Sequence, residues 1–327
     1  MDQAYEHKSR TTIDLFAAPH FQKCKPGGSC MHSISLRYFL AVANTGSLGE
    51  ASEKLHVTIS AISRQIAKLE DEVGYPLFER QPRGMALTKA GDLLAAHVRR
   101  TLLEGEQVLG EINALASFDR STIRIASSEA FARDILPRAI TRYLENSPGT
   151  RFELSVTAPK DVTLRVRNGD ADIGLTFSVL RDPEICVEYT RSSPIYALMP
   201  CSHDLATRSK VSLSDLQHFP IALLDPGTTI RQMFDMASSF DGLLFDPVLT
   251  CNNSSTLYFF TQISGAVSLT SRFAVRAQLA ENGLAAIPID HPGMALRSAQ
   301  IQTLSGRMLS ATLKGFIAQL IELLDVE

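Results

Sequence analysis

Apolar residues recur every three or four positions from residue 36 to residue 69, and short polar turns interrupt this pattern twice. The spacing predicts three amphipathic helices in succession. Gly46 suits the end of the first helix, because glycine adopts a positive φ at little cost. Ser47 begins the second helix and Glu50 follows three positions later, which predicts a capping box.

The third helix is predicted to begin at a cap formed by Thr58 or Ser60. Its outward face carries hydroxyl and basic side chains, and no acid occurs in it before Glu70. Such a face suits a helix that enters the major groove of DNA, although a helical hairpin with a solvated polar face would show the same periodicity. The candidate DNA-contacting residues of this helix are Thr58, Ile59, Ser60, Ser63, Arg64 and Lys68.

A short β-ribbon is predicted between Gly74 and Leu87, with Arg80 and Arg83 near its tip, and Thr88 is expected to cap the helix that follows. Two helices joined by a short turn and followed by such a ribbon form a winged helix-turn-helix. The whole segment resembles the LysR-type transcriptional regulators. The resemblance rests, in order, on Leu36, Phe39, Gly46, Ser47, Leu48, Ala51, Leu55, Ala61, Ile62, Ser63, Gln65, Ile66, Leu69, Glu70, Gly74, Leu77, Phe78, Arg80, Leu87, Thr88, Ala90 and Gly91.

This resemblance implies a DNA-binding transcriptional regulator controlled by a small-molecule effector. It places Arg80 and Arg83 on a wing that contacts double-stranded DNA, and it makes RNA polymerase a further candidate partner. Two positions depart from the family pattern. Ser52 replaces the second of two usual alanines, which is a small change, whereas Ile59 stands where the family tends to have glutamine. Ile59 offers a base only apolar contact, for instance to a thymine methyl, or else it turns inward and reads nothing.

One long helix is predicted from Thr88 to about residue 117. Its apolar residues alternate steps of three and four, as in the seam of a coiled coil. The seam residues are Ala95, Val98, Leu102, Gly105, Leu109, Ile112 and Ala116. Packing against the chain's own next domain would produce the same pattern. In the family this helix pairs with a second subunit, so the resemblance implies a homodimer, most often assembled into a homotetramer.

The patterning divides the chain into an N-terminal helical part and a C-terminal α/β part. Residues 1–30 are expected to be a disordered leader or the product of a misplaced start codon, because Met31 stands directly before the patterned segment. Residues 31–90 then form the winged helix-turn-helix and residues 88–118 the linker helix.

From residue 121 to residue 327, predicted strands and helices alternate, which favours parallel sheets built from βαβ units. The resemblance implies a two-lobed effector domain of the periplasmic-binding-protein-like type 2 fold. Lobe I is expected to take about 121–196 and 297–327, and lobe II about 197–296. The crossovers between them are placed near Tyr196–Pro200 and Ile289–Leu296.

Polar residues follow several of the predicted strands of this domain, where open α/β lobes collect ligands. The candidate effector-binding residues are Ser127, Ser128, Glu129, Thr176, Ser178, Thr228, Thr229, Arg231, Asn253, Ser254 and Ser255. Amides, hydroxyls and Arg231 suit a small anion, while Glu129 favours an amine, so the expected effector is anionic or zwitterionic. Each of these side chains would also serve as an ordinary helix cap, and only their convergence on one cleft favours a binding site.

Composition narrows the class of protein further. The chain has 327 residues, a formal net charge of −3 and 45% hydrophobic residues, enough for two or three folded domains. The near-neutral charge excludes a protein that coats nucleic acid through bulk positive charge, but it leaves room for a small DNA-reading head. The five cysteines form no CxxC pair and the eight histidines are scattered, so neither a disulfide framework nor a metal site is expected.

The sequence lacks the common hydrolase, metalloprotease, phosphate-loop and dinucleotide-binding motifs, so no catalytic residue and no cofactor is predicted. No apolar run reaches the length of a membrane helix, and together with the resemblance this favours the bacterial cytoplasm and its nucleoid. Two alternatives stay open at this point. One is a ligand sensor of the same fold whose DNA specificity is weakened by Ile59, and the other is an enzyme that uses the α/β cleft.

Overall fold

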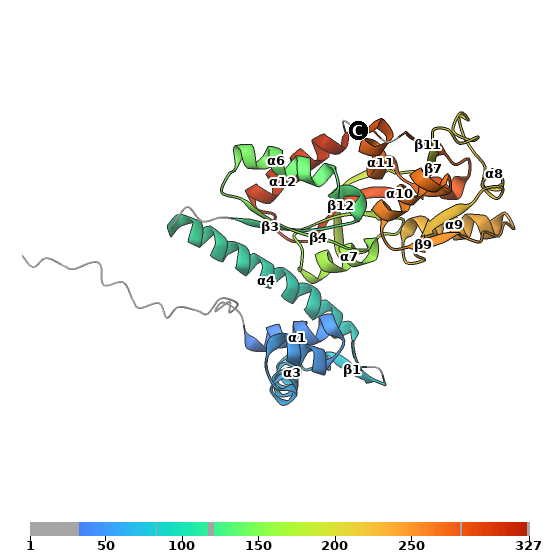
Figure 1. The fold of residues 1–327 in the computed structure, drawn as a ribbon. Helices are drawn as coiled ribbons and strands as arrows, with labels where there is room; N and C mark the ends of the chain where they lie inside the picture. The colour runs from blue at the N-terminus through green and yellow to red at the C-terminus, as the bar shows by residue number, and fades with distance from the viewer. Residues whose placement is uncertain (1–32, 83, 117–120, 282, 326–327) are drawn as a thin grey trace, which may run out of the picture.

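The computed structural model describes residues 33–325 except 83, 117–120 and 282, so the predictions for residues 1–30 and for Arg83 lie outside the described residues. A helical head, a long linker helix and two α/β lobes follow one another along the chain (Figure 1). The head and linker consist of α1 (Ile34–Thr45), α2 (Leu48–Leu55), α3 (Ile59–Val73), β1 (Phe78–Gln81), β2 (Gly84–Leu87) and α4 (Lys89–Ala116).

Local capping chemistry sets the ends of the head helices. Gly46 ends α1 with a φ of 66°, as its sequence position predicts. The Ser47 hydroxyl accepts a hydrogen bond from the Glu50 N–H, the first half of the predicted capping box, but the Ser47 N–H donates to the Thr45 hydroxyl and not to the Glu50 carboxylate. Of the two proposed caps for α3, Thr58 takes the role by accepting from the Ala61 N–H.

The core of the head includes the first turns of the linker helix. Ala95 and Val98 of α4 are fully buried with Phe39, Ile62 and Leu77 of the head. The first part of the predicted coiled-coil seam therefore packs inside its own chain. The seam prediction was wrong there because a helix face that serves a core and one that serves a partner show the same periodicity.

Beyond the head, α4 contacts lobe I of the same chain. The Arg99 guanidinium donates to the Glu184 carboxylate at 2.9 Å and to the Asn44 side-chain oxygen at 3.3 Å. Arg99 thus joins the end of α1 to lobe I. Farther along the helix, Leu103 lies against Gly169, where an added Cβ would meet the leucine side chain at 3.2 Å.

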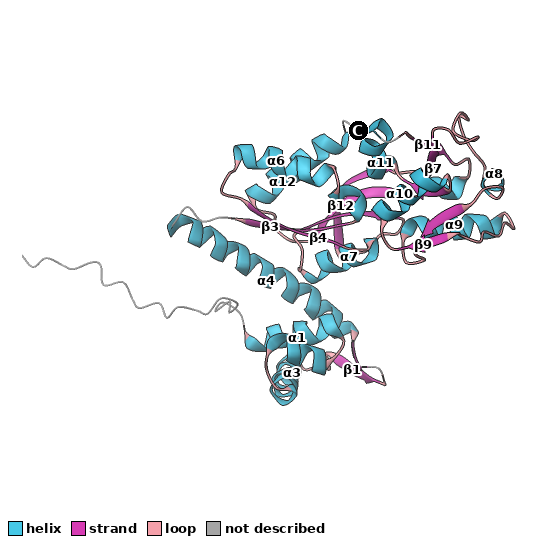
Figure 2. Ribbon diagram, viewed as in Figure 1, coloured by secondary structure: helices cyan, strands magenta, loops and turns pink. Residues whose placement is uncertain are grey.

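Lobe I is a five-stranded sheet in the order β4-β3-β5-β12-β6 with helices around it (Figure 2). Strands β3, β4 and β5 run parallel, as predicted, whereas β12 runs antiparallel to both β5 and β6. The sheet is therefore mixed rather than parallel throughout. The elements of this lobe are β3 (Thr122–Ser127), α5 (Glu129–Ala132), α6 (Ile135–Asn146), β4 (Arg151–Val156), α7 (Pro159–Asn168), β5 (Ile173–Ser178), β6 (Ile185–Ser192), β12 (Ser298–Leu304) and α12 (Ala311–Asp325).

Lobe II repeats this plan in the order β11-β7-β10-β8-β9, with β7 antiparallel to both of its neighbours. Its buried apolar side chains form clusters separate from those of lobe I. The elements of this lobe are β7 (Tyr196–Pro200), α8 (Leu213–Leu216), β8 (Ile221–Leu224), α9 (Thr229–Phe240), β9 (Leu249–Cys251), α10 (Ser254–Ser264), β10 (Val267–Thr270), α11 (Arg272–Glu281), β11 (Leu284–Pro288) and the 3-10 turn η1 (Pro292–Ala295).

The two lobes are connected by two crossovers, at residues 193–195 and 289–297. The second lies where the sequence placed it. The first was placed at Tyr196–Pro200, which is instead strand β7 of lobe II, so that prediction was wrong by a few residues. Among the described helices, none is long and apolar enough to cross a lipid bilayer.

Candidate functional site

The outer face of α3 carries the residues predicted to contact DNA. Thr58, Ile59, Ser60, Arg64 and Lys68 are exposed, and Ser63, the remaining candidate, is half-buried. The Ile59 side chain is 50% exposed at the first turn of the helix, so the alternative in which it turns inward is wrong. An exposed isoleucine at this point is free to contact an apolar group such as a thymine methyl.

The wing is held against the helix-turn-helix by backbone hydrogen bonds. The Glu70 carboxylate accepts from the Leu77 N–H at 2.7 Å and from the Phe78 N–H at 3.3 Å. On the second strand, the Met85 N–H donates to the Gly46 carbonyl at 2.7 Å. Arg80, exposed on β1, is therefore presented from a ribbon fixed at its base.

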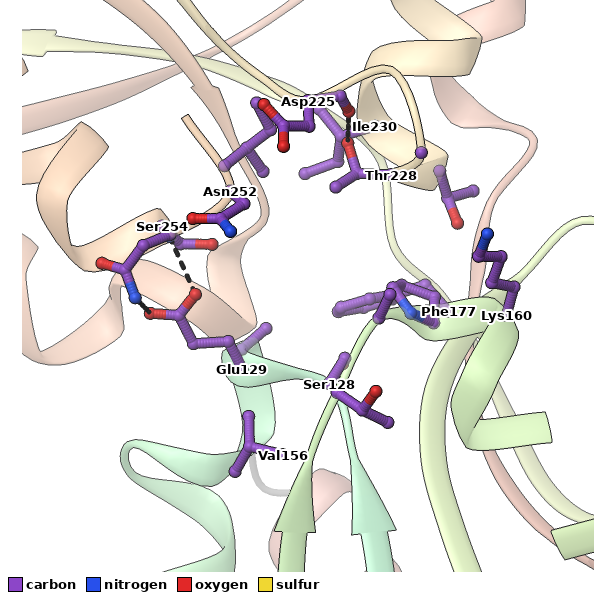
Figure 3. Close-up of a pocket in the computed structure, with 18 of the residues that line it drawn as sticks. Ser128, Glu129, Val156, Lys160, Phe177, Asp225, Thr228, Ile230, Asn252 and Ser254 are labelled. Carbon is purple, nitrogen blue, oxygen red and sulfur yellow. Dashed lines mark hydrogen bonds between the residues drawn. The ribbon is translucent and has the colours of Figure 1, made fainter. Parts of the chain in front are cut away.

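A cavity of about 550 Å³ opens between the two lobes, at the carboxyl ends of strands from both sheets (Figure 3). Its wall combines apolar, hydroxyl, amide and charged side chains. The lining residues are Ser128, Glu129, Ala130, Val156, Thr157, Ala158, Pro159, Lys160, Phe177, Leu224, Asp225, Gly227, Thr228, Thr229, Ile230, Asn252, Asn253, Ser254 and Arg297.

Six of the eleven predicted effector residues stand on this wall, and their role in binding stays a prediction. They are Ser128, Glu129, Thr228, Thr229, Asn253 and Ser254. The side chains of Ser127, Thr176 and Ser178 do not line the cavity. Each donates its hydroxyl to a backbone carbonyl of lobe I, and Ser127 and Thr176 are fully buried.

The other two predicted residues are engaged elsewhere. The Arg231 guanidinium pairs with the Asp235 carboxylate one helical turn later at 2.7 Å and donates to the Leu224 carbonyl at 3.2 Å, so it does not face the cavity as an anion ligand. The Ser255 hydroxyl donates to the Glu129 carboxylate at 2.8 Å. The orientation of each of these two side chains is set by a protein partner, and their role in effector binding stays a prediction.

Arg297, which sequence reasoning missed, is the most deeply buried charge on the cavity wall. The residue is 2% exposed, and its guanidinium lies 4.1 Å from the centre of the Phe177 ring and donates to Ser193. Within the described residues no carboxylate pairs with it. Burial lowers the pKa of Arg297 to about 9, so the side chain is still protonated at neutral pH.

Other polar groups on the wall are also unpaired. The Ser128 hydroxyl is buried and makes no hydrogen bond in the described part of the chain. Asp225, missed in the sequence although it directly follows β8, presents a carboxylate with no hydrogen bond or ion pair among the described residues (Figure 3). Lys160, at the start of α7, adds a second cation. The wall therefore carries both signs of charge.

Comparison with known proteins identifies the architecture. Residues 34–92 match the family described as bacterial regulatory helix-turn-helix protein, lysR family, and residues 116–325 match the LysR substrate binding domain. The second match alone spans more than half of the chain. The chain belongs to the LysR family. It is a DNA-binding transcriptional regulator with an effector-binding domain and not an enzyme.

Individual relatives agree with this assignment. This LysR-type regulator is 27% identical over 253 residues to the regulator SsuR of Burkholderia cenocepacia, covering 77% of this chain and 82% of SsuR. It is 35% identical over 204 residues to the dual regulator GltC of Bacillus subtilis, covering 62% of this chain and 68% of GltC. A full-length OxyR variant from Pseudomonas aeruginosa shares the fold, with a TM-score of 0.57 at 20% identity over 90% of this chain and 96% of OxyR.

Proposed function

We propose that this LysR-type regulator responds to a small organic anion bound in the cavity between its lobes. The observation that carries the proposal is Arg297, a buried guanidinium on the cavity wall that no described carboxylate neutralises. Burying an unpaired charge is costly, and an anionic ligand would remove that cost. The unpaired hydroxyl of Ser128 supplies a hydrogen-bond donor on the same wall.

The acids of the wall favour an effector that also carries a positive charge. Glu129 and Asp225 repel a ligand with several negative groups, and the half-buried Asp225 carboxylate is free to bind an ammonium group. A ligand that pairs with both Arg297 and Asp225 carries a negative and a positive group. This describes a zwitterion of amino-acid size or somewhat larger. A related fold, the Synechocystis CcmR regulatory domain, was solved in complex with 2-PG; it shares 16% identity at a TM-score of 0.55 over 62% of this chain and 96% of that domain.

Thermal unfolding in the presence of matched compounds tests the ligand class. The probes are α-amino acids, each compared with the amine that lacks its carboxylate and with the acid that lacks its amine. We expect only the zwitterions to raise the unfolding temperature of the effector domain, because only they pair with both Arg297 and Asp225. Stabilisation by amines alone, or by uncharged compounds, would contradict the proposal.

Substitutions on the cavity wall test which side chain binds which charged group of the effector. Arg297→Met is expected to abolish the response, and Ser128→Ala, which removes one hydroxyl, to weaken it in a protein that folds normally. Asp225→Asn is expected to reduce the preference for the zwitterion over its deaminated acid. Arg231→Met is the matched control, because its guanidinium pairs with Asp235 outside this cavity.

We further propose that the exposed face of α3 and the wing form the DNA-contacting surface, with Ile59 against an apolar base edge. Recovery of genomic fragments bound by the purified protein, followed by footprinting, tests this assignment. A protected sequence with dyad symmetry is expected. Recovery of salt-sensitive, sequence-indifferent fragments alone would favour the second candidate, a ligand sensor whose DNA specificity is weakened at Ile59.

The later turns of α4 support a proposal about assembly. Val108 and Ile112 lie one turn apart and are 43% and 52% exposed, so this part of the helix offers an apolar stripe to a second copy. We propose a homodimer through this stripe, assembled into a tetramer, acting on the bacterial nucleoid in the cytoplasm with RNA polymerase as a further partner. Light scattering of the purified protein measures the assembly; a monomer at micromolar concentration would contradict it.

A further inference from the structure

Glu129 binds across the boundary between the two lobes. It is the first residue of α5 in lobe I, yet its carboxylate reaches the start of α10 in lobe II (Figure 3). There it accepts hydrogen bonds from the Ser254 N–H at 2.8 Å, the Ser255 N–H at 3.2 Å and the Ser255 hydroxyl at 2.8 Å. The Asn253 side-chain amide donates a fourth bond at 3.2 Å.

These bonds complete the N-terminus of α10. The first N–H groups of a helix have no partner within the helix, and they lie at the positive end of the helix dipole, which attracts anions. Asn253 accepts from the third group, the Thr256 N–H, at 2.8 Å. Glu129 takes the first two, at Ser254 and Ser255. The described contacts therefore leave none of these three groups for an added anion.

We propose that Glu129 is a built-in ligand of lobe II, which occupies the anion-binding end of α10 and ties the lobes together without an effector. The inference rests on the proposed function only for its consequence, which concerns where an effector binds in the same cavity. An anionic group of the effector is kept away from α10 and is directed to Arg297 and Ser128. Lobe closure at this point then does not require the effector.

The lobes meet at a second, apolar contact, which separates the role of Glu129 from general packing. Phe273 of α11 in lobe II packs on Phe131 and Phe177 of lobe I, with ring centres 5.7 Å and 6.4 Å apart. This contact does not involve Glu129 and is expected to remain when Glu129 is changed. A variant at Glu129 is therefore expected to lose the tie at α10 while the two lobes stay folded and associated.

Hydrogen exchange of the full-length protein tests the proposal. In Glu129→Ala the amides of Ser254 and Ser255 are expected to exchange on the order of ten- to a hundred-fold faster, because hydrogen bonds to a charged group are lost. The amide of Leu257 serves as an internal control, since its acceptor is the backbone carbonyl of Asn253. Glu145→Ala, an exposed glutamate of α6 in the same lobe, is the matched control variant.

Chemical rescue with acetate separates a true anion site from a structural cap. Millimolar acetate is expected to restore slow exchange at Ser254 and Ser255 in Glu129→Ala and to leave the wild type unchanged, because the site is filled there. Glu129→Gln, which keeps the size but loses the charge, is expected to exchange at an intermediate rate.

Three results would overturn the proposal. The first is an unchanged exchange rate of the Ser254 and Ser255 amides in Glu129→Ala. The second is faster exchange in this variant that acetate does not slow, and the third is that acetate slows exchange in the wild type as much as in the variant. The proposed function is measured separately, through the stabilisation by zwitterions that depends on Arg297. That response is measured on the wild type and on Arg297→Met, which both keep Glu129, so failure of one proposal is distinguishable from failure of the other.

Discussion

Replacing Asp172 by asparagine removes the charge at the centre of a buried ionic cluster in lobe I. The carboxylate accepts hydrogen bonds from the Arg124 backbone N–H at 2.8 Å, from the Arg124 guanidinium at 3.0 Å and from the Arg307 guanidinium at 2.8 Å. The side chains of Asp172 and Arg307 are 7% and 9% exposed. Asp172→Asn keeps the shape but leaves two guanidinium groups without their common partner.

The size of the effect follows from burial. Removing one partner of a buried ion pair costs about 3–5 kcal/mol, because the remaining charge is left uncompensated. Arg124 softens this cost, since its side chain is 31% exposed and Glu106 offers a second carboxylate at 3.7 Å. We therefore expect the low end of that range, about 3 kcal/mol. Asp170→Asn, at an exposed aspartate two positions earlier, is expected to change the stability by less than about 0.5 kcal/mol.

The assay is native-state hydrogen exchange in increasing urea, followed at the amides of β3 and β5. Exchange reports the opening free energy of lobe I alone, which matters because a chain with several domains has no single free energy of unfolding. The chain contains no tryptophan, so circular dichroism rather than intrinsic indole fluorescence serves as the global probe. Equal opening free energies for Asp172→Asn and Asp170→Asn would refute the reasoning.

The same cluster predicts a pH dependence. Burial by itself raises the pKa of the Asp172 carboxyl, but hydrogen bonds from Arg124 and the charges of Arg124 and Arg307 outweigh it and hold the pKa below its usual value. A carboxyl with a depressed pKa in the folded state stabilises the fold fully above its unfolded pKa of about 4, and this contribution is lost as the pH falls through the folded value. The difference between wild type and Asp172→Asn is therefore expected to shrink below pH about 4.

Two further changes test the head. Arg64→Ala is expected to cost about 1–3 kcal/mol of DNA-binding free energy and to relax the preference at one base pair. Selection of binding sites from a randomised pool measures this, and an unchanged preference would remove Arg64 from the reading surface. Gly91→Ala is expected to destabilise the head and abolish DNA binding, because the added Cβ collides with the Leu77 carbonyl oxygen, whereas Gly149→Ala meets nothing within 4 Å. Footprinting at matched protein concentration compares the two variants. Equal protection of the DNA by both would show that the head accommodates the added methyl group at Gly91.

Local chemistry made much of the fold predictable. The caps at Ser47 and Thr58 and the glycine end of α1 depend on residues within a few positions, so the sequence contains all that is needed. Strand β8 is a short apolar run and β3 alternates apolar with polar residues, and each leads into a polar turn, so both can be read from the sequence. The antiparallel strands β7 and β12 were missed, since the alternation rule of βαβ units does not generate them.

The cavity was less predictable, because side-chain direction depends on distant partners. The rule that ligands collect at strand ends found Ser128 and Thr228, and applied consistently it would also have found Asp225. The pairing of Arg231 was not predicted, although Asp235, four positions later on the same helix, was visible in the sequence as its partner. No neighbouring residue in the sequence indicates that Arg297 lies on the cavity wall, because only the return of the chain through the second crossover brings it there.

Helix α4 is a continuous connection between the head and lobe I. Its 28 residues make a rod about 42 Å long. Its first turns are built into the head through Ala95 and Val98, and Arg99 and Leu103 fasten the next turns to lobe I. With no free joint between the two attachments, a tilt of lobe I by about ten degrees displaces one end of the rod relative to the other by about 7 Å. That displacement is about two base-pair steps along DNA. In the proposed dimer, a small tilt of lobe I is therefore expected to change which turns of the double helix the two heads reach together.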